Sequence, residues 1–461
     1  MKFYFLVVIA IFFTTCQSSP VTQGNDPQPK GEVVVFTNVN VISMERESPL
    51  MRQTVVIEDD KIFNISPEAT YPEGAQLIDG TGKYLVPGLA EMHAHIPTPG
   101  QSEELIKETL FLYLAAGVTT IRGMLGHPRH LELRSQVGEG SILGPHIYTS
   151  GPSINGNTAP DAETAVQMVR EQQEAGYNFL KLHPGLKREV FDAIVSTAQE
   201  VDIPYAGHVS RAVGVHHALN SDYASIDHID GYVEGLVPPE KGVNPEENGF
   251  FGINFTDLVD EGLLPALIQT TVDHHVWVVP TQCLAERWAG PSAAADMLSD
   301  SEMAYMSGEI LGRWEESKNQ MQADDAYDSD RAQRFIDLRR RIIKAMYDGG
   351  VGILLGSDAP QVFNVPGFAI LHEIEMYVAA GLTPYEALVT GTINPAKYFG
   401  HENDRGLIKK GYQADLMLVD GNPLAEISNL RNNSGVMIRG KWLSQEYIEE
   451  KLARIAENYG H

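Results

Sequence analysis

Eight apolar, strand-like runs alternate with helical patterns through the middle of the chain, and this alternation constrains the fold more than any other feature. Strands separated by helices in this way form βα units, whose strands lie parallel in one sheet. The expected strands cover 88–95, 118–124, 146–153, 179–183, 204–209, 225–229, 276–281 and 352–358. The clearest helical patterns cover 103–116, 162–175, 188–200 and 331–348. Eight such units close into a barrel, so we expect an α/β fold of the (β/α)8 or TIM type.

Shorter β-rich segments with polar turns flank this body at both ends of the chain. The 461 residues exceed one ordinary domain and suit a barrel with an added module. We therefore expect the barrel at 86–403, inserted into a small β-sandwich domain that is built from 31–85 and 404–461. Two connections inside the barrel are too long for simple turns. We interpret 232–262 as a lid and 291–326 as an extra helical pair.

The first 30 residues predict export. Lys2 precedes the apolar run 3–13, which is too short to span a bilayer and fits a secretory signal. Cys16, followed by a polar, proline-rich stretch, resembles the lipid-attachment cysteine of a bacterial lipoprotein. We therefore expect a signal peptide and tether over 1–30 and a periplasmic or cell-surface location. A lipid anchor to the membrane is the main expectation, and plain secretion is the alternative.

Charge and cysteine content narrow the range of partners. The 34 basic and 61 acidic side chains give a formal net charge of −27, which repels phosphate backbones, so no nucleic-acid partner is expected. Besides Cys16 the chain contains only Cys283. Acylation of Cys16 would leave no disulfide, and we interpret Cys283 as a buried structural thiol, not a nucleophile. The sequence does not distinguish a monomer from a homo-oligomer.

Residue types that bind metals recur at the ends of the expected strands. In V-P-G-L-A-E-M-H-A-H, His93 and His95 are two positions apart and so project from the same face of a strand. Two neutral imidazoles side by side offer a bidentate corner for zinc or a similar cation, and two histidines in a polar loop are the alternative. His208, His228 and Asp358 end three further strands.

Lys181 lies inside an apolar strand, F-L-K-L-H. An unpaired buried ammonium is costly, so this lysine must form a pair or lose its charge. Reaction with CO2 would give a carbamate, an anionic oxygen ligand able to bridge two cations. A structural, salt-bridged lysine is the alternative. His183 points the same way along the strand and could replace Lys181 as a ligand.

The combined pattern resembles the binuclear amidohydrolase superfamily, in particular its imidazolonepropionase-like and Xaa-Pro-dipeptidase-like hydrolases. The similarity runs from about Gly31 to the C-terminus and includes V-P-G-L, T-P-Y-E-A-L-V-T-G-T-I-N-P-A and G-L-I-K-K-G-Y-Q-A-D-L-M-L-V-D-G-N-P-L. The resemblance implies two divalent metal ions, expected to be zinc, with a bridging hydroxide that attacks the substrate. The metal ligands that it implies are His93, His95 and Asp358 for one ion, His208 and His228 for the other, and carbamylated Lys181 between them. Asp358 would also be catalytic, passing a proton to the leaving amine.

Four further residues near expected strand ends are candidates for substrate contact: Arg122, His146, Tyr148 and Arg211. His146 and Tyr148 share a face of their strand, and an arginine suits a substrate carboxylate through bidentate pairing. Structural ion pairs and core hydrogen bonds explain each of these residues equally well.

We therefore expect an exported, metal-dependent hydrolase that cleaves an amide C–N bond of a small molecule, of the dipeptide or N-acyl amino acid class. A lactonase or phosphotriesterase with the same site is an alternative, as is a one-metal deaminase, although Lys181 argues against the latter. A non-catalytic surface binding lipoprotein is the alternative from another class. Two ions per chain would favour the hydrolase, and none would favour the binding protein.

Overall fold

The computed structural model describes residues 31–98 and 100–460. The predicted signal peptide and Cys16 lie outside these residues. Within the described part, no helix combines the length and the apolar character that crossing a bilayer requires.

Eight parallel segments form a closed ring in the middle of the chain. The regular strands of this ring are β6 (Leu89–Ala94), β7 (Val118–Gly123), β8 (His146–Thr149), β9 (Leu180–Leu182), β10 (Tyr205–Gly207), β11 (Ser225–Asp227) and β12 (Trp277–Val279). The bridge between Ser150 and Phe179 joins β8 to β9. The eighth segment, 352–358, is not a regular strand, but bridges at Ile353 and Ala359 connect it to β12 and β6. The ring is therefore complete, and the predicted (β/α)8 barrel is confirmed.

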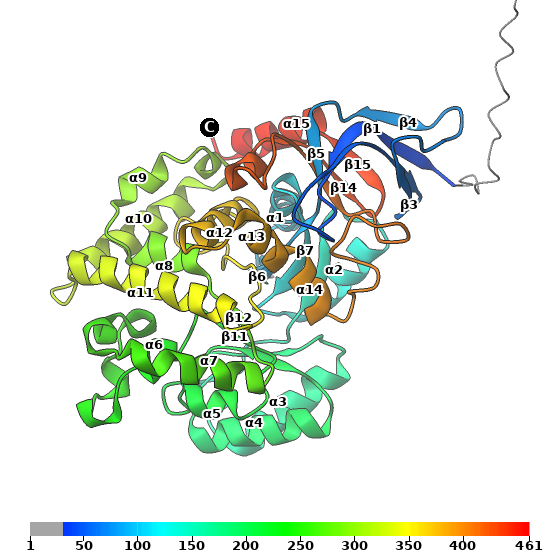
Figure 1. Cartoon of the computed structure of the whole chain (residues 1–461). Coiled ribbons are helices and arrows are strands. Elements are labelled where there is room, and N and C mark those ends of the chain that lie inside the picture. Colours follow the sequence, from blue (N-terminus) through cyan, green and yellow to red (C-terminus); the bar gives the residue numbers. More distant parts are fainter. Residues whose placement is uncertain (1–30, 99, 461) are drawn as a thin grey trace, which may run out of the picture.

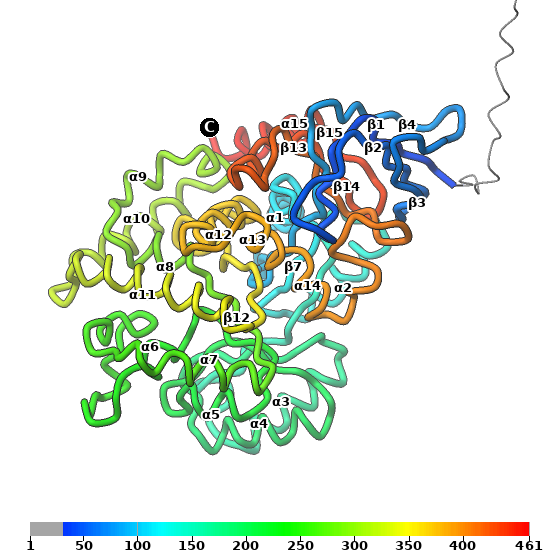
Figure 2. Tube along the Cα trace, viewed as in Figure 1, coloured from blue at the N-terminus to red at the C-terminus, as the bar shows by residue number. Residues whose placement is uncertain are grey.

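Helices cover the outside of the barrel (Figure 2). They are α1 (Glu103–Ala115), α2 (Pro128–Gly138), α3 (Ala162–Glu174), α4 (Arg188–Glu200), α5 (Val215–Leu219), α7 (Leu264–Asp273), α8 (Gln282–Ala289), α11 (Ser329–Asp348), α12 (Phe368–Ala379), α13 (Pro384–Gly391) and α14 (Ile393–Tyr398). Several begin at a side chain that caps the first turn: Ser102, Asp161 and Asp328 accept from the backbone N–H three residues later. The predicted helices correspond to α1, α3, α4 and α11, with ends that differ by at most two residues.

The two long connections contain short helices. The predicted extra helical pair consists of α9 (Ala294–Leu298) and α10 (Gly308–Ala323), joined through the 3-10 helix η5 (Ser301–Tyr305). The segment 232–262 contains α6 (Tyr232–Gly235) and the 3-10 helices η1 (Pro239–Lys241), η2 (Pro245–Glu247), η3 (Phe250–Leu258) and η4 (Glu261–Leu263).

Strands from both ends of the chain form one eight-stranded sheet beside the barrel (Figure 1). They are β1 (Val33–Val41), β2 (Leu50–Glu58), β3 (Lys61–Ser66), β4 (Gln76–Asp79), β5 (Lys83–Pro87), β13 (Leu416–Asp420), β14 (Asn433–Ile438) and β15 (Lys441–Ser444). The sheet curls over its own core, since Phe36 of β1 packs edge-on against Trp442 of β15 at 5.2 Å. The 3-10 helix η6 (Ile427–Arg431) and the C-terminal helix α15 (Gln445–Asn458) complete this region. Because β5 leads directly into β6, the sheet is attached to the end of the barrel at which its strands begin.

Candidate active site

The structure brings the six predicted metal-binding side chains together at the end of the barrel where the strands finish. They are His93, His95, Lys181, His208, His228 and Asp358. The Oδ1 atom of Asp358 lies 2.7 Å from Nε2 of His95 and 3.6 Å from Nε2 of His93. The ring of His228 lies 4.6 Å from that of His93 and 4.4 Å from that of His208, measured between centroids. Residues from five parts of the barrel therefore face one small space.

The polar atoms of this cluster fit a divalent metal ion. Nδ1 of His93 and Nε2 of His228 are buried and have no hydrogen-bond partner. His93 Nδ1 does lie 3.1 Å from Oδ2 of Asp227, but this pair does not meet hydrogen-bond geometry. His93, His228 and Asp358 each offer a ligand atom within 4.8 Å of the others. Imidazole nitrogen and carboxylate oxygen are the donors that zinc and similar ions prefer.

Burial keeps the histidines in the form that binds metal. Loss of solvation, reinforced by the charge of Lys181, lowers the pKa of His93 to about 4. Loss of solvation also lowers the pKa of His228 well below its usual value. Both imidazoles are therefore neutral at physiological pH, which leaves a lone pair free for coordination.

Neighbouring side chains fix the orientation of two of the rings. Nδ1 of His228 lies 2.8 Å from Oγ1 of Thr281, and Nδ1 of His208 lies 3.1 Å from Oδ2 of Asp230. When Nδ1 of His228 donates its proton to Thr281, Nε2 carries the lone pair. Such contacts from residues behind the ligands set the tautomer and raise metal affinity.

Lys181 is fully buried and forms an ion pair with Asp227, with 3.2 Å between Nζ and Oδ2. Desolvation lowers the pKa of this lysine, although Asp227 opposes the shift. Burial alone would raise the pKa of Asp227, but Lys181 and Arg122 together hold it well below its usual value. Gly207 provides the space for the lysine, because a Cβ at that position would lie 2.9 Å from Lys181 Cδ.

Glu91 joins the first and last strands of the barrel beneath the site. Its carboxylate accepts from the backbone N–H groups of His93 and Ser357, both at 2.9 Å, and from the Ser357 hydroxyl. Desolvation raises the pKa of Glu91 to about 8. The backbone at two ligands is also unusual, since His228 and Asp358 both have φ of +64°. Left-handed backbone costs a non-glycine residue about 1–2 kcal/mol, so the surrounding contacts must hold these conformations.

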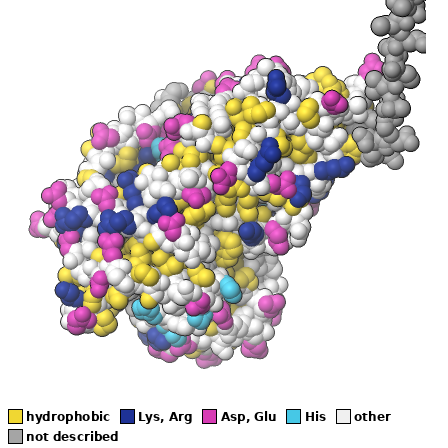
Figure 3. All heavy atoms as spheres, viewed as in Figure 1, with side chains coloured by type: hydrophobic (Ala, Val, Ile, Leu, Met, Phe, Trp, Pro, Cys, Tyr) yellow, Lys and Arg dark blue, Asp and Glu magenta, His cyan; other side chains and the backbone are white. Residues whose placement is uncertain are grey.

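The segment 232–262, predicted to be a lid, lies against this cluster. The ring of Phe251 stacks on His228 at 4.9 Å and on His208 at 6.2 Å. Ion pairs fasten the same segment to α11, with Arg334 2.7 Å from Asp257 and Arg341 2.8 Å from Glu261. Acidic and basic side chains alternate on this face of the molecule (Figure 3). The segment therefore packs against two of the histidines of the cluster.

One predicted substrate contact lies inside the barrel core. Arg122 is fully buried and donates to the Met92 carbonyl at 2.7 Å, to Ser225 Oγ at 2.8 Å and to Asp227 at 3.0 Å. Its guanidinium is thus fully occupied by the protein. The prediction that Arg122 binds the substrate is wrong, because this side chain has no exposed surface and its guanidinium pairs with Asp227 inside the barrel.

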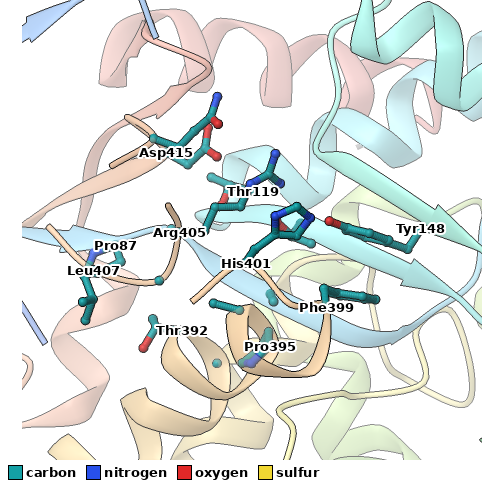
Figure 4. Close-up of a pocket in the computed structure, with 17 residues that line it drawn as sticks. Pro87, Thr119, Tyr148, Thr392, Pro395, Phe399, His401, Arg405, Leu407 and Asp415 are labelled. Carbon is teal, nitrogen blue, oxygen red and sulfur yellow. The ribbon is translucent and has the colours of Figure 1, made fainter. Parts of the chain in front are cut away.

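Two further predicted contacts lie at the opposite end of the barrel, next to the small sheet. Nε2 of His146 lies 2.9 Å from Oδ2 of Asp415. The ring of Tyr148 stacks on Phe399 at 3.6 Å, in a pocket that His401 also lines (Figure 4). The prediction that His146 and Tyr148 bind the substrate is therefore wrong for a reaction at the metal-binding cluster.

The fourth predicted contact, Arg211, lies at the rim of the site. Together with His208 it lines a cavity of about 600 Å³ that opens to solvent. Its side chain is 42% exposed and pairs with Glu246 at 3.1 Å. Arg211 is therefore free to reorient toward a bound molecule, and its role in substrate binding stays a prediction.

Sequence reasoning missed several residues that support the site. Asp227 directly precedes His228 in a buried strand, and Glu91 lies two positions before His93 in another. An acid inside an apolar strand was the available signal, and it is the same signal that identified Asp358. Phe251 had no such signal, since its position depends on the path of a long loop.

Comparison with known proteins agrees with this geometry. Residues 84–443 match the amidohydrolase family. The ochratoxinase of Aspergillus niger is 22% identical over 411 residues, which cover 82% of this chain and 79% of that enzyme.

Solved structures share the fold. A bottromycin amidohydrolase superposes with a TM-score of 0.71 at 21% identity, covering 94% of this chain and 91% of its own. A Xaa-Pro dipeptidase with bound methionine in the active site superposes with a TM-score of 0.63 at 18% identity, covering 90% and 100%. The family match spans most of the chain, including the whole barrel and the strands of the small sheet that follow residue 83. The chain therefore belongs to the amidohydrolase family and is a hydrolase of carbon–nitrogen bonds.

Proposed function

We propose that this protein hydrolyses an amide bond of a small molecule, of the dipeptide or N-acyl amino acid class, with two divalent metal ions in its site. The observation that carries the proposal is the convergence of four histidines, a buried lysine and Asp358, with Nε2 of His228 left without a hydrogen-bond partner. The similarity to a Xaa-Pro dipeptidase and to an ochratoxinase supports the choice of an amide substrate.

His93, His95 and Asp358 would hold one ion, and His208 and His228 the other. Bound there, divalent ions polarise a substrate carbonyl and lower the pKa of a water molecule toward neutrality. We propose zinc, because the nitrogen-rich donor set favours it over magnesium or calcium.

Asp358 is the residue that moves the proton in this proposal. Burial alone would raise the pKa of its carboxyl, but His93 and His95 hold it below the usual value, so the group is ionised at neutral pH. The carboxylate accepts a proton from the attacking water as the new C–O bond forms. It then donates that proton to the departing nitrogen as the C–N bond breaks, so the products are a carboxylic acid and an amine.

Lys181 would act as a carbamate between the two ions. Its lowered pKa favours the neutral amine, which is the form that reacts with CO2. The carbamate nitrogen would keep one hydrogen and the new group would be anionic, which would replace the attraction between ammonium and Asp227 with attraction to the metals. Some rearrangement of Asp227 would therefore accompany the modification.

We also propose that the chain is exported and attached to a membrane through Cys16. The apolar run 3–13 and the position of Cys16 directly after it support this location. A small-molecule substrate in the periplasm or outside the cell would then reach the site without crossing the inner membrane.

A hydrolysis screen tests the proposed function. Zinc-loaded and metal-free protein would be compared on a library of dipeptides, N-acyl amino acids, lactones and phosphotriesters. We expect amide hydrolysis by the loaded protein, bound zinc at two ions per chain, and loss of turnover after chelation. Turnover of lactones or phosphotriesters alone would contradict the proposed substrate class, and a protein that binds no metal would contradict the site.

A further inference from the structure

Two cavities of different chemistry flank the metal-binding cluster. The cavity on the side of His208 includes four charged side chains, Lys187, Arg211, Asp230 and Glu246. The other cavity opens beside His95 and has a volume of about 250 Å³. This is near the lower end of the usual range for ligand pockets, about 300–1,000 Å³, so the cavity can accept a group larger than a methyl.

The walls of the cavity beside His95 are mainly apolar and come from separate parts of the chain. Ile96 follows β6, Leu105 and Leu112 belong to α1, and Met306 and Ile310 come from the inserted segment between β12 and α11. Met306 and Leu112 are almost fully buried, whereas Leu105 and Ile310 are half-buried. An insertion beyond the barrel therefore supplies one side of an apolar pocket.

The charged group on this cavity already has partners. Glu108 accepts from Asn458 Nδ2 at 2.7 Å and from the Tyr459 hydroxyl at 2.9 Å, both near the end of the C-terminal helix. Within the described residues no lysine or arginine lines the cavity. A substrate carboxylate would therefore lose its hydration here without gaining a cation, which is costly.

The position of the cavity indicates which half of the substrate it meets. His95, whose Nε2 atom lies 2.7 Å from Asp358 Oδ1, lines the cavity, and so do Pro360 and Gln361, which follow Asp358 closely in the chain. In the proposed function Asp358 passes its proton to the departing nitrogen. The group bonded to that nitrogen therefore extends from Asp358 into this cavity, while the acyl half extends toward the polar cavity at His208.

We infer that the cavity beside His95 selects substrates whose leaving amine carries an uncharged apolar group, such as a branched alkyl or aryl side chain. The acyl half would carry the polar or charged group of the substrate. This inference rests on the proposed amide hydrolysis and narrows its substrate class to molecules whose leaving amine has an apolar side chain.

Two series of amides test the inference with the zinc-loaded, full-length protein. In the first series, N-acetylglycine amides of methylamine, isobutylamine and phenethylamine vary only the leaving amine. In the second series, methylamides with acyl groups of increasing length vary only the other half. We expect kcat/KM to rise at least about tenfold from methylamine to isobutylamine, since each added methylene in a fitting pocket raises it by about that factor or more. Across the acyl series kcat/KM should change less than across the leaving-amine series.

Ile310→Gln and Leu105→Gln are matched variants, because both side chains are only half-buried and neither touches the metal-binding cluster. Either variant should remove most of the preference for isobutylamine over methylamine and leave the zinc content within about twofold. Leu263→Gln changes an exposed leucine outside the cavity and should alter none of these values.

Two outcomes separate the inference from the proposed function. Hydrolysis of all amides without dependence on the leaving amine, or dependence only on the acyl half, would overturn the inference and leave amide hydrolysis intact. Failure of the zinc-loaded protein to hydrolyse any amide would overturn the proposed function instead.

Discussion

Nε2 of His95 lies 2.7 Å from Oδ1 of Asp358, although 263 positions separate the two residues in the chain. The contact spans the seam of the barrel, where β6 meets the 352–358 segment through the bridge between Ala94 and Ala359. Glu91 and Ser357 reinforce the same seam one layer below. Closure of the ring therefore completes the site, and a change that opens the seam would disrupt fold and chemistry together.

Asp358→Asn should abolish proton transfer with little change in shape. We expect kcat for an amide substrate to fall at least about 10²–10⁴-fold, the usual contribution of a general acid or base. KM should change much less. Zinc content must be measured alongside, because Asp358 is also a proposed ligand. A variant that keeps both its zinc and a kcat within tenfold of the parent enzyme would show that another group moves the proton.

Lys181→Ala should reduce both zinc content and turnover, because it removes the proposed shared ligand. The carbamate itself is tested by reloading metal-free protein with zinc in CO2-free buffer, with and without added bicarbonate. We expect activity to recover only with bicarbonate, and ¹³C-labelled bicarbonate to give a carbamate carbon signal in the NMR spectrum. Lys441→Ala, at an exposed lysine of β15, is the control. Equal recovery in both buffers would favour a lysine that serves only as the salt-bridge partner of Asp227.

Thr281→Val should weaken metal binding without removing a ligand. The variant loses the contact between Thr281 Oγ1 and His228 Nδ1, which sets the tautomer in which Nε2 carries the lone pair. Loss of such a supporting contact typically lowers metal affinity about 10–100-fold. Zinc competition titrations would measure the change, and Thr281→Ser, which keeps the hydroxyl, should bind zinc like the parent. Unchanged affinity in Thr281→Val would mean that packing alone orients the ring.

The barrel was predictable because its signals are local. Each buried strand appears as an apolar run, and capping residues such as Ser102 and Asp161 mark where the helices begin. The 352–358 segment shows the limit of this reasoning. Its apolar run G-I-L-L-G-S-D reads as a strand, but its backbone is held by bridges at Ile353 and Ala359 instead of by a continuous ladder.

The site was predictable to the extent that strand ends converge in a barrel. This geometry brings His93 and His228 together from opposite halves of the sequence. The same reasoning failed for His146, because that residue lies at the beginning of its strand and so at the other end of the barrel. It also failed for Arg122, which points into the barrel interior, since the sequence gives no measure of how deep an inward side chain lies.

A last prediction concerns Glu373 on α12, a carboxylate buried behind the site. It accepts from the backbone N–H groups of Gln282 at 2.9 Å and Cys283 at 2.5 Å. Desolvation nevertheless raises its pKa from 4.5 to about 7, because these hydrogen bonds only partly replace water. The thiol of Cys283 is buried as well, and desolvation raises its pKa well above the usual value, which agrees with a structural role.

The raised pKa of Glu373 predicts the direction of a stability change with pH. Below pH 4.5 the carboxyl is protonated in both the folded and the unfolded chain, so the group adds no pH-dependent free energy. Between pH 4.5 and about 7 only the unfolded chain ionises, so stability falls as pH rises, by about 3 kcal/mol at most.

Glu373→Gln cannot ionise and should lack this fall in stability. The variant loses a hydrogen bond at every pH, but its deficit in thermal midpoint relative to the parent should shrink from pH 5 to pH 8. The control is Glu375→Gln, at a partly exposed glutamate of the same helix that pairs with Arg431. Its thermal midpoint should differ from that of the parent by the same amount at pH 5 and at pH 8. A constant deficit for Glu373→Gln across this range would mean that Glu373 is ionised in the folded protein at pH 5, and that its two backbone donors fully offset the loss of solvent.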